Sequence, residues 1–380
     1  MAIEEKIRGS FQKNFAHVQD PRNEQRTSHL LIDIIAIALL AVISGAEGWG
    51  AIETYGKAKE EWLKKFLDLP NGIPSHDTFS RVFARLSPQE FEQGFQNWLE
   101  NIVEQIDINI IAIDGKMLRQ SYDRNQQQKS LILVSAWCQE HRLVLGQEKV
   151  DSKSNEITAI PQLLNQLDIA GCTITIDAMG TQKEIASQIC QKGGDYILAL
   201  KANQKNLYKA VYESFEKAKE VNSIDLENRH FTQVEKSHNR IEKRTIEVLP
   251  ASVISSKESS KWQNLATIIR VERERKLWNK TSHEICFYIS SLEVDAQEFA
   301  TKIRSHWGIE NTLHWTLDVT FSEDKSRIRR DHAAENFAIL RRLAVNLINQ
   351  EKTLKSSTKM KRYRAALDNN YLLKILSTSS

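Results

Sequence analysis

The sequence predicts an α/β protein: a mixed β-sheet covered by helices, preceded by a helical domain and interrupted by a β-rich insertion. Three patterns predict this class. Residues 1–104 carry apolar side chains at helical spacing, short apolar strands alternate with helices from residue 109, and residues 203–295 are again strand-like. Apolar residues make up 41% and charged residues 27% of the 380, which is typical of a folded, water-soluble chain with a sizeable core.

The first 104 residues are expected to form a helical domain. Its most apolar stretch, at 30–45, contains Asp33 and is too short to cross a bilayer, so it predicts a buried helix that ends at Gly45. Ser75 is the predicted N-cap of one later helix, and Pro88 stands at the first position of the next. Such a module suits either DNA reading or docking, and its sequence does not separate the two.

The core segment is expected to contain three strands, a helix, a strand, a helix and a fifth strand. The segments, in chain order, are NIIAIDGK, SLILVSAWCQE, RLVLGQEKV, EITAIPQLLNQLD, CTITIDAMG, TQKEIASQICQKGG and DYILALK. Gly193 and Gly194 end the second helix. Alternation of this kind predicts a mixed sheet with helices packed on it.

The rest of the chain is expected to pass from strands back to helices. Strand-like segments begin at 230, 264 and 283, and helices are predicted at 295–319 and 331–352, with a basic final helix. The predicted organisation is a helical domain at 1–104, a first core part at 105–202, a β-strand insertion at 203–295, a second core part at 296–350 and a basic tail at 351–380.

Charge and cysteine usage narrow the class of protein further. Residues 301–380 hold 15 Lys and Arg against 8 Asp and Glu, which predicts a polyanion partner or a solvated basic tail. The four cysteines are scattered without metal-site spacing, as in a reducing compartment, and the N-terminus has no apolar signal region. We therefore expect a cytoplasmic protein without a membrane segment.

Two aspartates end buried strands of the predicted core. Asp114 follows IIAI and Asp177 follows TITI, so the two carboxylates meet at one sheet edge if these strands are neighbours. Adjacent carboxylates repel each other unless a cation lies between them, and Mg²⁺ is the ion that prefers such oxygens. Two such ions would serve an in-line phosphoryl displacement. The alternatives are a hairpin turn at Asp114-Gly115 and a helix N-cap at Asp177.

A third carboxylate, Glu310, lies between His306 and His314 in HWGIENTLHWTLDVTF, all on one face of a predicted helix. We interpret Glu310 as the third metal ligand, with the histidines beside the scissile phosphate. A His-Glu-His transition-metal site or a surface helix residue are the alternatives. Trp307 and Trp315 either anchor the helix on the sheet or stack on an unpaired base.

Five blocks of this sequence resemble a known family. IAIDGK, TIDAMGTQKEIA, GGDYILALKANQ, SHNRIEKR and IRSHWGIENTLHWTLDVTFSEDKSRIR are similar to DDE transposases of bacterial insertion sequences, in particular the ISAs-type group with the H-repeat-associated proteins. The resemblance runs from about residue 5 to 375. It implies an RNase H-like core whose catalytic Asp-Asp-Glu triad, Asp114, Asp177 and Glu310, binds two Mg²⁺ or Mn²⁺ ions.

The activity implied by the resemblance is metal-dependent cleavage of DNA at the ends of an insertion sequence, followed by strand transfer into target DNA. The expected partners are the terminal inverted repeats, target DNA and a second copy of the chain, and the expected location is the bacterial nucleoid. A DNA-binding relative whose catalysis has decayed, and an RNase H-like nuclease without strand transfer, are the alternatives.

Basic side chains near the triad are predicted to contact DNA phosphates. They are Lys116, Lys201, Arg240, Arg304, His306, His314, Lys325, Arg327, Arg329, Arg330, Arg341 and Arg342. A surface salt-bridge face is the alternative for the later arginines. The family's Tyr, Arg and Lys positions near the glutamate are Ile303, His306 and Leu317 here, and its His-Gly-Arg motif reads His238-Asn239-Arg240. We therefore expect Arg304, His306 and His314 to take over the phosphate contacts of the family's Arg and Lys.

Overall fold

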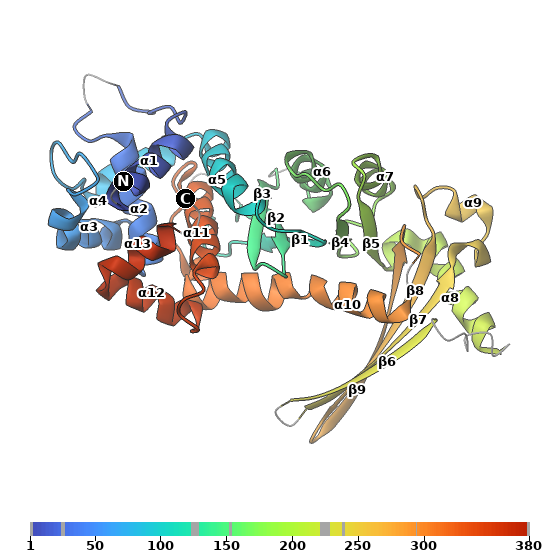
Figure 1. Ribbon diagram of the computed structural model, residues 1–380. Coiled ribbons are helices and arrows are strands. Elements are labelled where there is room, and N and C mark those ends of the chain that lie inside the picture. Colours follow the sequence, from blue (N-terminus) through green and yellow to red (C-terminus); the bar gives the residue numbers. More distant parts are fainter. Residues whose placement is uncertain are drawn as a thin grey trace.

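The structure is a computed structural model that describes residues 3–23, 27–122, 129–151, 154–220, 229–237, 240–293 and 295–377. The molecule is elongated, with a helical region at one end, a sheet in the middle and long strands that project from the other end (Figure 1). The predicted mixed α/β class with a helical N-terminal region is confirmed.

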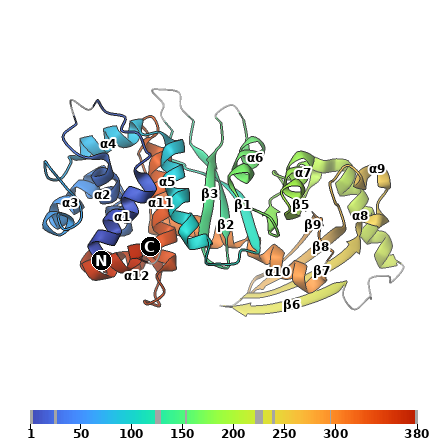
Figure 2. The ribbon, with the colours of Figure 1, turned by 45° about the horizontal axis from the view of Figure 1, so that its top comes forward.

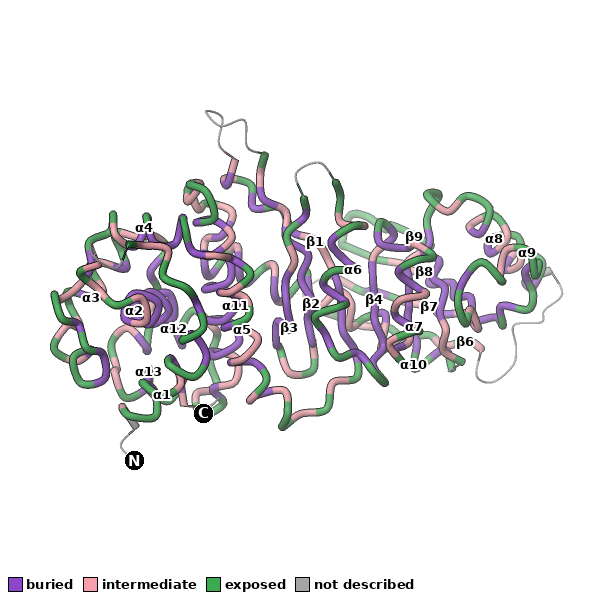
Figure 3. Tube along the Cα trace, turned by 90° about the horizontal axis from the view of Figure 1, so that it is seen from above, coloured by how far each residue is buried: buried purple, intermediate pink, exposed green. Residues whose placement is uncertain are grey.

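The helical region combines both ends of the chain. Its N-terminal helices are α1 (Ile3–Phe15), α2 (Leu31–Ile43), α3 (Trp49–Leu63), α4 (His76–Arg85) and α5 (Pro88–Val103). Helix α2 is apolar on all sides and is buried from Asp33 to Ile43, so it lies at the centre of the region (Figure 3). It is followed by Gly45 at a φ of 111°, as expected for a glycine that ends a helix.

The predicted basic tail is instead part of this helical region. Helix α11 (Ala333–Gln350) packs against α2, and the chain continues into α12 (Thr358–Leu367) and α13 (Asn369–Ser377), which contact α2 and α1. Figure 2 shows the two termini side by side. Leu372 and Ile375 are fully buried. Burial of apolar side chains, which the basic composition obscured, therefore fixes this segment to the fold.

The central sheet has nine strands in the order β3-β2-β1-β4-β5-β9-β8-β7-β6. Its first five are β1 (Ile110–Met117), β2 (Ile132–Cys138), β3 (Leu143–Lys149), β4 (Thr173–Ile176) and β5 (Asp195–Leu200). Strands β1, β4 and β5 are parallel to one another, β2 pairs with β1 in the antiparallel sense, and β3 pairs with β2 in the antiparallel sense. Helices α6 (Glu156–Gln166) and α7 (Lys183–Gln191) cover one face, which confirms the predicted order of elements in the core.

The insertion extends this sheet. Helix α8 (Lys205–Glu220), which the sequence reading did not predict, leads to β6 (His230–Ser237), β7 (Arg240–Pro250), β8 (Thr267–Leu277) and β9 (Lys280–Ser290). Strand β9 pairs with β5 in the antiparallel sense, so the inserted strands are continuous with the core. Their distal halves project beyond the covering helices, and Trp278 at the tip is 87% exposed (Figure 1).

The element that carries Glu310 differs from the prediction of one regular helix over 295–319. Helix α10 (Ala296–His306) is α-helical and packs on the sheet face opposite α6 and α7, whereas η4 (Ile309–His314) and η5 (Thr316–Thr320) are π-helical. Gly308 precedes η4 and packs against Gln139, where a Cβ atom would overlap the Gln139 side chain. Such π-helical turns are frequent at functional sites.

Candidate active site

The two aspartates lie at neighbouring positions of two paired strands. In the parallel pair of β1 and β4, Ile113 is paired with Ile176, and Asp114 and Asp177 are the next residues on each side. Asp114 itself is inside β1 and opposite Ser135 of β2, so it does not form a hairpin turn. Both carboxylates therefore stand at the carboxyl edge of the parallel strands, where functional groups of such sheets collect.

Asp177 is held by the loop that follows it. Its Oδ1 atom accepts hydrogen bonds from the backbone N–H groups of Met179 at 3.1 Å and Gly180 at 3.3 Å. The residue before α7 is Gln182, so Asp177 is not the N-cap of that helix. The loop fixes one carboxylate oxygen of Asp177.

Glu310 approaches the aspartates from η4, which packs against β1. Burial first, and then the nearby negative charges of Asp177 and Glu310, raise the pKa of Asp114 to about 7. Glu310 itself is exposed, whereas the Asp114 side chain is 15% exposed. The three acidic residues, far apart in sequence, therefore act electrostatically on one another at one place.

The two histidines point into the protein. His306 Nδ1 lies 3.0 Å from the Thr175 hydroxyl on β4, and His314 Nδ1 lies 3.6 Å from Oδ2 of Asp114. Burial lowers the pKa of both, that of His314 to about 3, so both imidazoles are neutral near pH 7. The two imidazoles are therefore placed to support the carboxylates from inside the protein. They do not face outward, as the predicted contact with a DNA phosphate requires.

The two tryptophans near Glu310 lie in different surroundings. Trp307 is covered by the inserted strands, with the Arg273 guanidinium 5.4 Å from its ring centroid. Trp315 is 57% exposed. The anchoring interpretation therefore fits Trp307, and Trp315 is the one free to stack on a base.

A buried ionic network lies beside the site and changes the assignment of three predicted DNA contacts. Lys116 Nζ is 2.7 Å from Asp318 and 2.9 Å from Asp324, and Arg342 is 3.0 Å from Glu323. Lys116 is 7% exposed, Arg341 2% and Arg342 1%. The prediction that these three bind DNA is wrong for this structure, because segment 318–324 and helix α11 enclose them.

The remaining predicted contacts divide into paired and exposed side chains. Arg304 pairs with Glu235 at 2.8 Å, Arg240 with Glu242 at 3.6 Å, and Arg329 donates to the Gln120 carbonyl at 2.8 Å. Lys201, Lys325 and Arg327 are exposed and have no ion pair among the described residues, and the exposed Arg330 has only Asp331, at 3.7 Å. His238 and Asn239 of the predicted motif lie outside the described residues. The exposed four are the strongest candidates for DNA contact.

The carboxylates fit a divalent metal ion in donor chemistry but are not yet in coordinating positions. Mg²⁺ and Mn²⁺ prefer such hard oxygens, and a cation would relieve the repulsion that raises the pKa of Asp114. Within the described ranges, no group of three or more His, Cys, Asp or Glu is placed so that it could hold a metal. Coordination therefore requires side-chain movement, most of all at the exposed Glu310.

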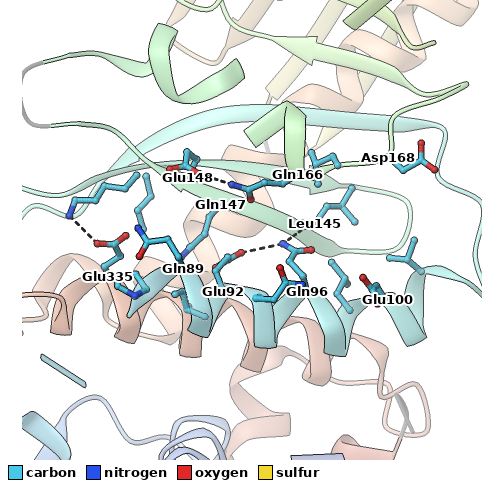
Figure 4. Close-up of a pocket in the computed structure, with 18 of the residues that line it drawn as sticks. Gln89, Glu92, Gln96, Glu100, Leu145, Gln147, Glu148, Gln166, Asp168 and Glu335 are labelled. Atoms are coloured by element: carbon cyan, nitrogen blue, oxygen red, sulfur yellow. Dashed lines mark hydrogen bonds and ion pairs between the residues drawn. The ribbon is translucent and has the colours of Figure 1, made fainter. Parts of the chain in front are cut away.

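A separate cavity of about 590 Å³ lies between α5 and β3. Glu92 and Gln96 face Gln147 and Glu148 across it (Figure 4). None of the three acidic residues above lines this cavity. It is therefore distinct from the candidate active site.

Comparisons with known proteins identify the family. Residues 105–347 match the family model described as "Transposase DDE domain", and residues 12–99 match its associated domain, "DDE_Tnp_1-associated". The chain belongs to the DDE transposase family. The "H repeat-associated putative transposase YhhI" of Escherichia coli (strain K12) is 43% identical over 368 residues, covering 95% of this chain and 96% of the relative. "Putative transposase YncI" of Escherichia coli O157:H7 is 41% identical over 367 residues, covering 96% and 93%.

Among solved structures, the piggyBac transposase synaptic complex with hairpin DNA matches with a TM-score of 0.43 and 10% identity, covering 98% of this chain and 78% of that one.

In the present chain, Ile303 and Leu317, which replace the family's Tyr and Lys, are buried, at 6% and 0% exposure. These two side chains belong to the core, so any phosphate contact must come from other residues.

No helix among the described residues is long and apolar enough to cross a membrane.

One acidic residue near the site was not found by sequence reasoning. Glu156 is the first residue of α6, where a glutamate is common in any helix, so its position carried no signal. In the structure its carboxylate lies against Gly115, next to Asp114. Only the packing of α6 on the sheet brings it there.

Proposed function

We propose that this chain is an active transposase with an RNase H-like core, which cuts DNA at the ends of its element and joins the freed strand to target DNA. The observation that carries the proposal is the convergence of Asp114, Asp177 and Glu310 at one sheet edge. Family membership and the strand arrangement, in which β1 is paired with parallel β4 on one side and with the antiparallel strand β2 on the other, support it.

In the proposed chemistry, the acidic residues Asp114, Asp177 and Glu310 hold two Mg²⁺ or Mn²⁺ ions. Bound ions would supply charge stabilisation for the attacking and leaving oxygens of an in-line displacement. In the first step water attacks phosphorus and the 3′ oxygen leaves as a hydroxyl. In the second, that 3′-hydroxyl attacks a phosphorus of the target, and the 3′ oxygen of the target strand leaves and takes up a proton. His314, neutral and 3.6 Å from Asp114, orients that carboxylate.

The DNA partner is proposed to lie along the exposed basic residues at this edge. Lys201 follows β5, and Lys325, Arg327 and Arg330 follow η5. These contacts would position the backbone without reading its sequence. The terminal repeats of the element, the target in the nucleoid and a second copy of the chain are the proposed partners.

The test is strand cleavage of a duplex that carries the element end, with Mg²⁺ or Mn²⁺. We expect Asp114→Asn, Asp177→Asn and Glu310→Gln each to reduce cleavage by at least about 10³-fold, with DNA binding retained. Cleavage at the wild-type rate in these variants would remove the proposed mechanism. Joined products distinguish a transposase from a nuclease, which yields only nicks. End binding without cleavage under any metal condition would indicate a decayed relative.

A further inference from the structure

Helix α4 of the helical region presents two arginines on its exposed face. Its opposite face is buried, and Phe83 on that face stacks on Trp49 with the ring centroids 5.2 Å apart. Arg81 and Arg85 are exposed and four residues apart, so their side chains lie on one face of the helix. Within the described ranges neither arginine forms an ion pair, so both positive charges face solvent.

The helix itself explains only one of these arginines. The helix dipole favours a cation in the last turn, which accounts for Arg85. Arg81 lies one turn earlier, where this effect has faded, and its Nε donates to the backbone carbonyl of Asp77 at 3.2 Å. The Asp77 carboxylate, on the same face, lies 3.6 Å from Nε2 of His76. The pair of arginines therefore fits a partner that supplies negative charge.

The basic segment 325–332 connects the proposed triad to α4. Asp324, just before this segment, lies 2.9 Å from Lys116 on the strand that carries the first aspartate of the triad. At the other end of the segment, the backbone N–H of His332 donates to the carbonyl of Ala84 at 3.1 Å. The chain therefore runs from the carboxyl edge of the sheet to the last turn of α4.

Buried hydrogen bonds hold α4 at the end of this segment. Asn336 of α11 is fully buried, and its Nδ2 donates to the carbonyls of Phe83 at 2.8 Å and Leu86 at 2.9 Å. In Figure 2, α4 lies on the same side of the molecule as the carboxyl ends of β1 and β3. One path from the triad to α4 thus passes, in order, the exposed cations Lys325, Arg327, Arg330, Arg85 and Arg81.

We propose that the exposed face of α4 binds duplex DNA of the element end, beyond the point of cleavage, with Arg81 and Arg85 on its phosphates. The inference rests on the proposed function, because it assumes that DNA enters the site at the triad. Duplex DNA fits because its phosphates supply the charge that these arginines lack, and because it is long enough to follow the whole path. The N-terminal helices would then hold the DNA that the core cuts.

The test is fluorescence anisotropy with a labelled duplex of about 30 base pairs, three helical turns, that carries the element end. Divalent ions are left out, so that no strand is cut. We expect the double variant Arg81→Gln with Arg85→Gln to bind about tenfold more weakly or worse. The slope of log affinity against log salt should fall by about 2, because two fewer counterions are released.

The matched control is the double variant Lys355→Gln with Lys359→Gln. These lysines are also exposed, four residues apart and without an ion pair in the part of the chain that the structure describes. They follow α11, whose last residue, Gln350, donates to the carbonyl of His141 at 3.1 Å in the turn between β2 and β3. That turn lies at the amino edge of the sheet, so the control should leave the affinity and the slope unchanged.

Two further comparisons separate a contact on α4 from a change in folding. Arg81→Lys with Arg85→Lys keeps both positive charges and should keep the salt slope of the wild type. When the flank of the duplex is shortened stepwise, the wild type should lose affinity until it equals the Gln double variant, because the DNA then no longer reaches α4.

The possible results distinguish this inference from the proposed function. Wild-type affinity and slope in the Gln double variant, with element-end cleavage that still depends on Asp114, would overturn the inference and leave the proposed function intact. Wild-type DNA affinity with loss of a dimer in analytical ultracentrifugation would assign this face to a second copy of the chain, and would also overturn it. No binding of the element end by the wild type would overturn both.

Discussion

Lys116, on the strand that carries Asp114, forms ion pairs with acidic residues at the end of the π-helical segment and just after it. Its ammonium group contacts Asp318 at 2.7 Å, Asp324 at 2.9 Å and Glu323 at 3.5 Å, while its side chain is 7% exposed. Burial lowers the pKa of this lysine, but the surrounding carboxylates, Glu323 first, raise it above its usual value. Lys116 is therefore charged and is a structural partner of three acidic residues.

Replacement of Lys116 by Met should lower the free energy of unfolding by about 3–5 kcal/mol, because it leaves buried carboxylates without their cation. Denaturant unfolding followed by circular dichroism measures the change. Arg119→Met is the control, since Arg119 contacts the same Asp324 at 3.2 Å but is 78% exposed, and should cost about 1 kcal/mol or less. Equal effects of the two substitutions would show that burial does not decide the strength of this network.

Glu92, in the cavity between α5 and β3, gives the protein a pH-dependent stability. Burial raises its pKa to about 8, against hydrogen bonds from Gln96 and the Gln147 backbone that lower it. A raised carboxyl pKa stabilises the fold fully below the unfolded value of 4.5, and this contribution is lost as pH rises through about 8. The folded protein should therefore become less stable between these two values.

Glu92→Gln should remove that loss and should be more stable than the wild type at pH 8.5 by about 1–3 kcal/mol. At about pH 3, below both pKa values, the two proteins should differ little, because Glu92 is then protonated in both states. Urea unfolding at several pH values tests this. If the free energies of unfolding of the two proteins changed with pH in parallel, Glu92 would be ionised in the folded protein.

Among the elements, the π-helical turn that presents Glu310 depends on a contact with Gln139, the residue that follows β2. Gly308 packs against Gln139, whose Oε1 accepts a hydrogen bond from the buried Trp137 indole N–H at 2.8 Å. A Cβ atom at Gly308 would overlap Oε1 and Cδ of Gln139 and would lie 2.9 Å from its Cγ. The place where η4 begins is therefore set by this close approach.

Gly308→Ala should destabilise the protein by about 1–2 kcal/mol and reduce DNA cleavage. Alanine favours a helix by about 1 kcal/mol over glycine, but displacing Gln139 leaves the Trp137 indole unpaired at a cost of about 1–3 kcal/mol, and the overlap adds to this. In a Gln139→Ala background the overlap is absent, so Gly308→Ala should there stabilise the fold. Destabilisation by the same amount in both backgrounds would contradict this account.

The strands and helices of the core were predictable because their signals are local. Asp114 and Asp177 each end an apolar run, and Ser75 and Pro88 mark helix starts that the structure contains. The π-helical turn was not predictable, because it depends on Gly308 meeting Gln139, which is far away in sequence. The partners of Lys116 and the approach of Glu156 to Gly115 are non-local in the same way.

Across the whole molecule, the positive charge of the C-terminal segment is divided between structure and surface. Arg362 is 5% exposed, donates to the carbonyl of Val42 at 2.9 Å and stacks over Phe321 at 3.9 Å. It thus joins the helical region to the end of η5. The positive charge of residues 301–380 predicted a polyanion partner, which agrees with membership of a transposase family. The charge count alone did not distinguish such buried arginines from the exposed residues that could contact DNA.

The two ends of one strand provide a test of which face of the whole molecule meets DNA. Lys201 follows β5 at the carboxyl edge, where the proposed triad lies, and Lys192 follows α7 just before β5 at the opposite edge. If DNA lies along the carboxyl edge, Lys201→Gln should reduce the slope of log affinity against log salt by about 1, since one fewer counterion is released. Lys192→Gln should leave the slope unchanged.

Fluorescence anisotropy with a labelled duplex at several salt concentrations measures both slopes. The comparison is sharp because each variant loses one positive charge, so a general change in net charge affects them equally. If only Lys192→Gln reduced the slope of log affinity against log salt, the duplex would lie at the amino edge, away from Asp114 and Asp177. Such a result would separate DNA binding from the carboxylates and would contradict their proposed role in cutting it.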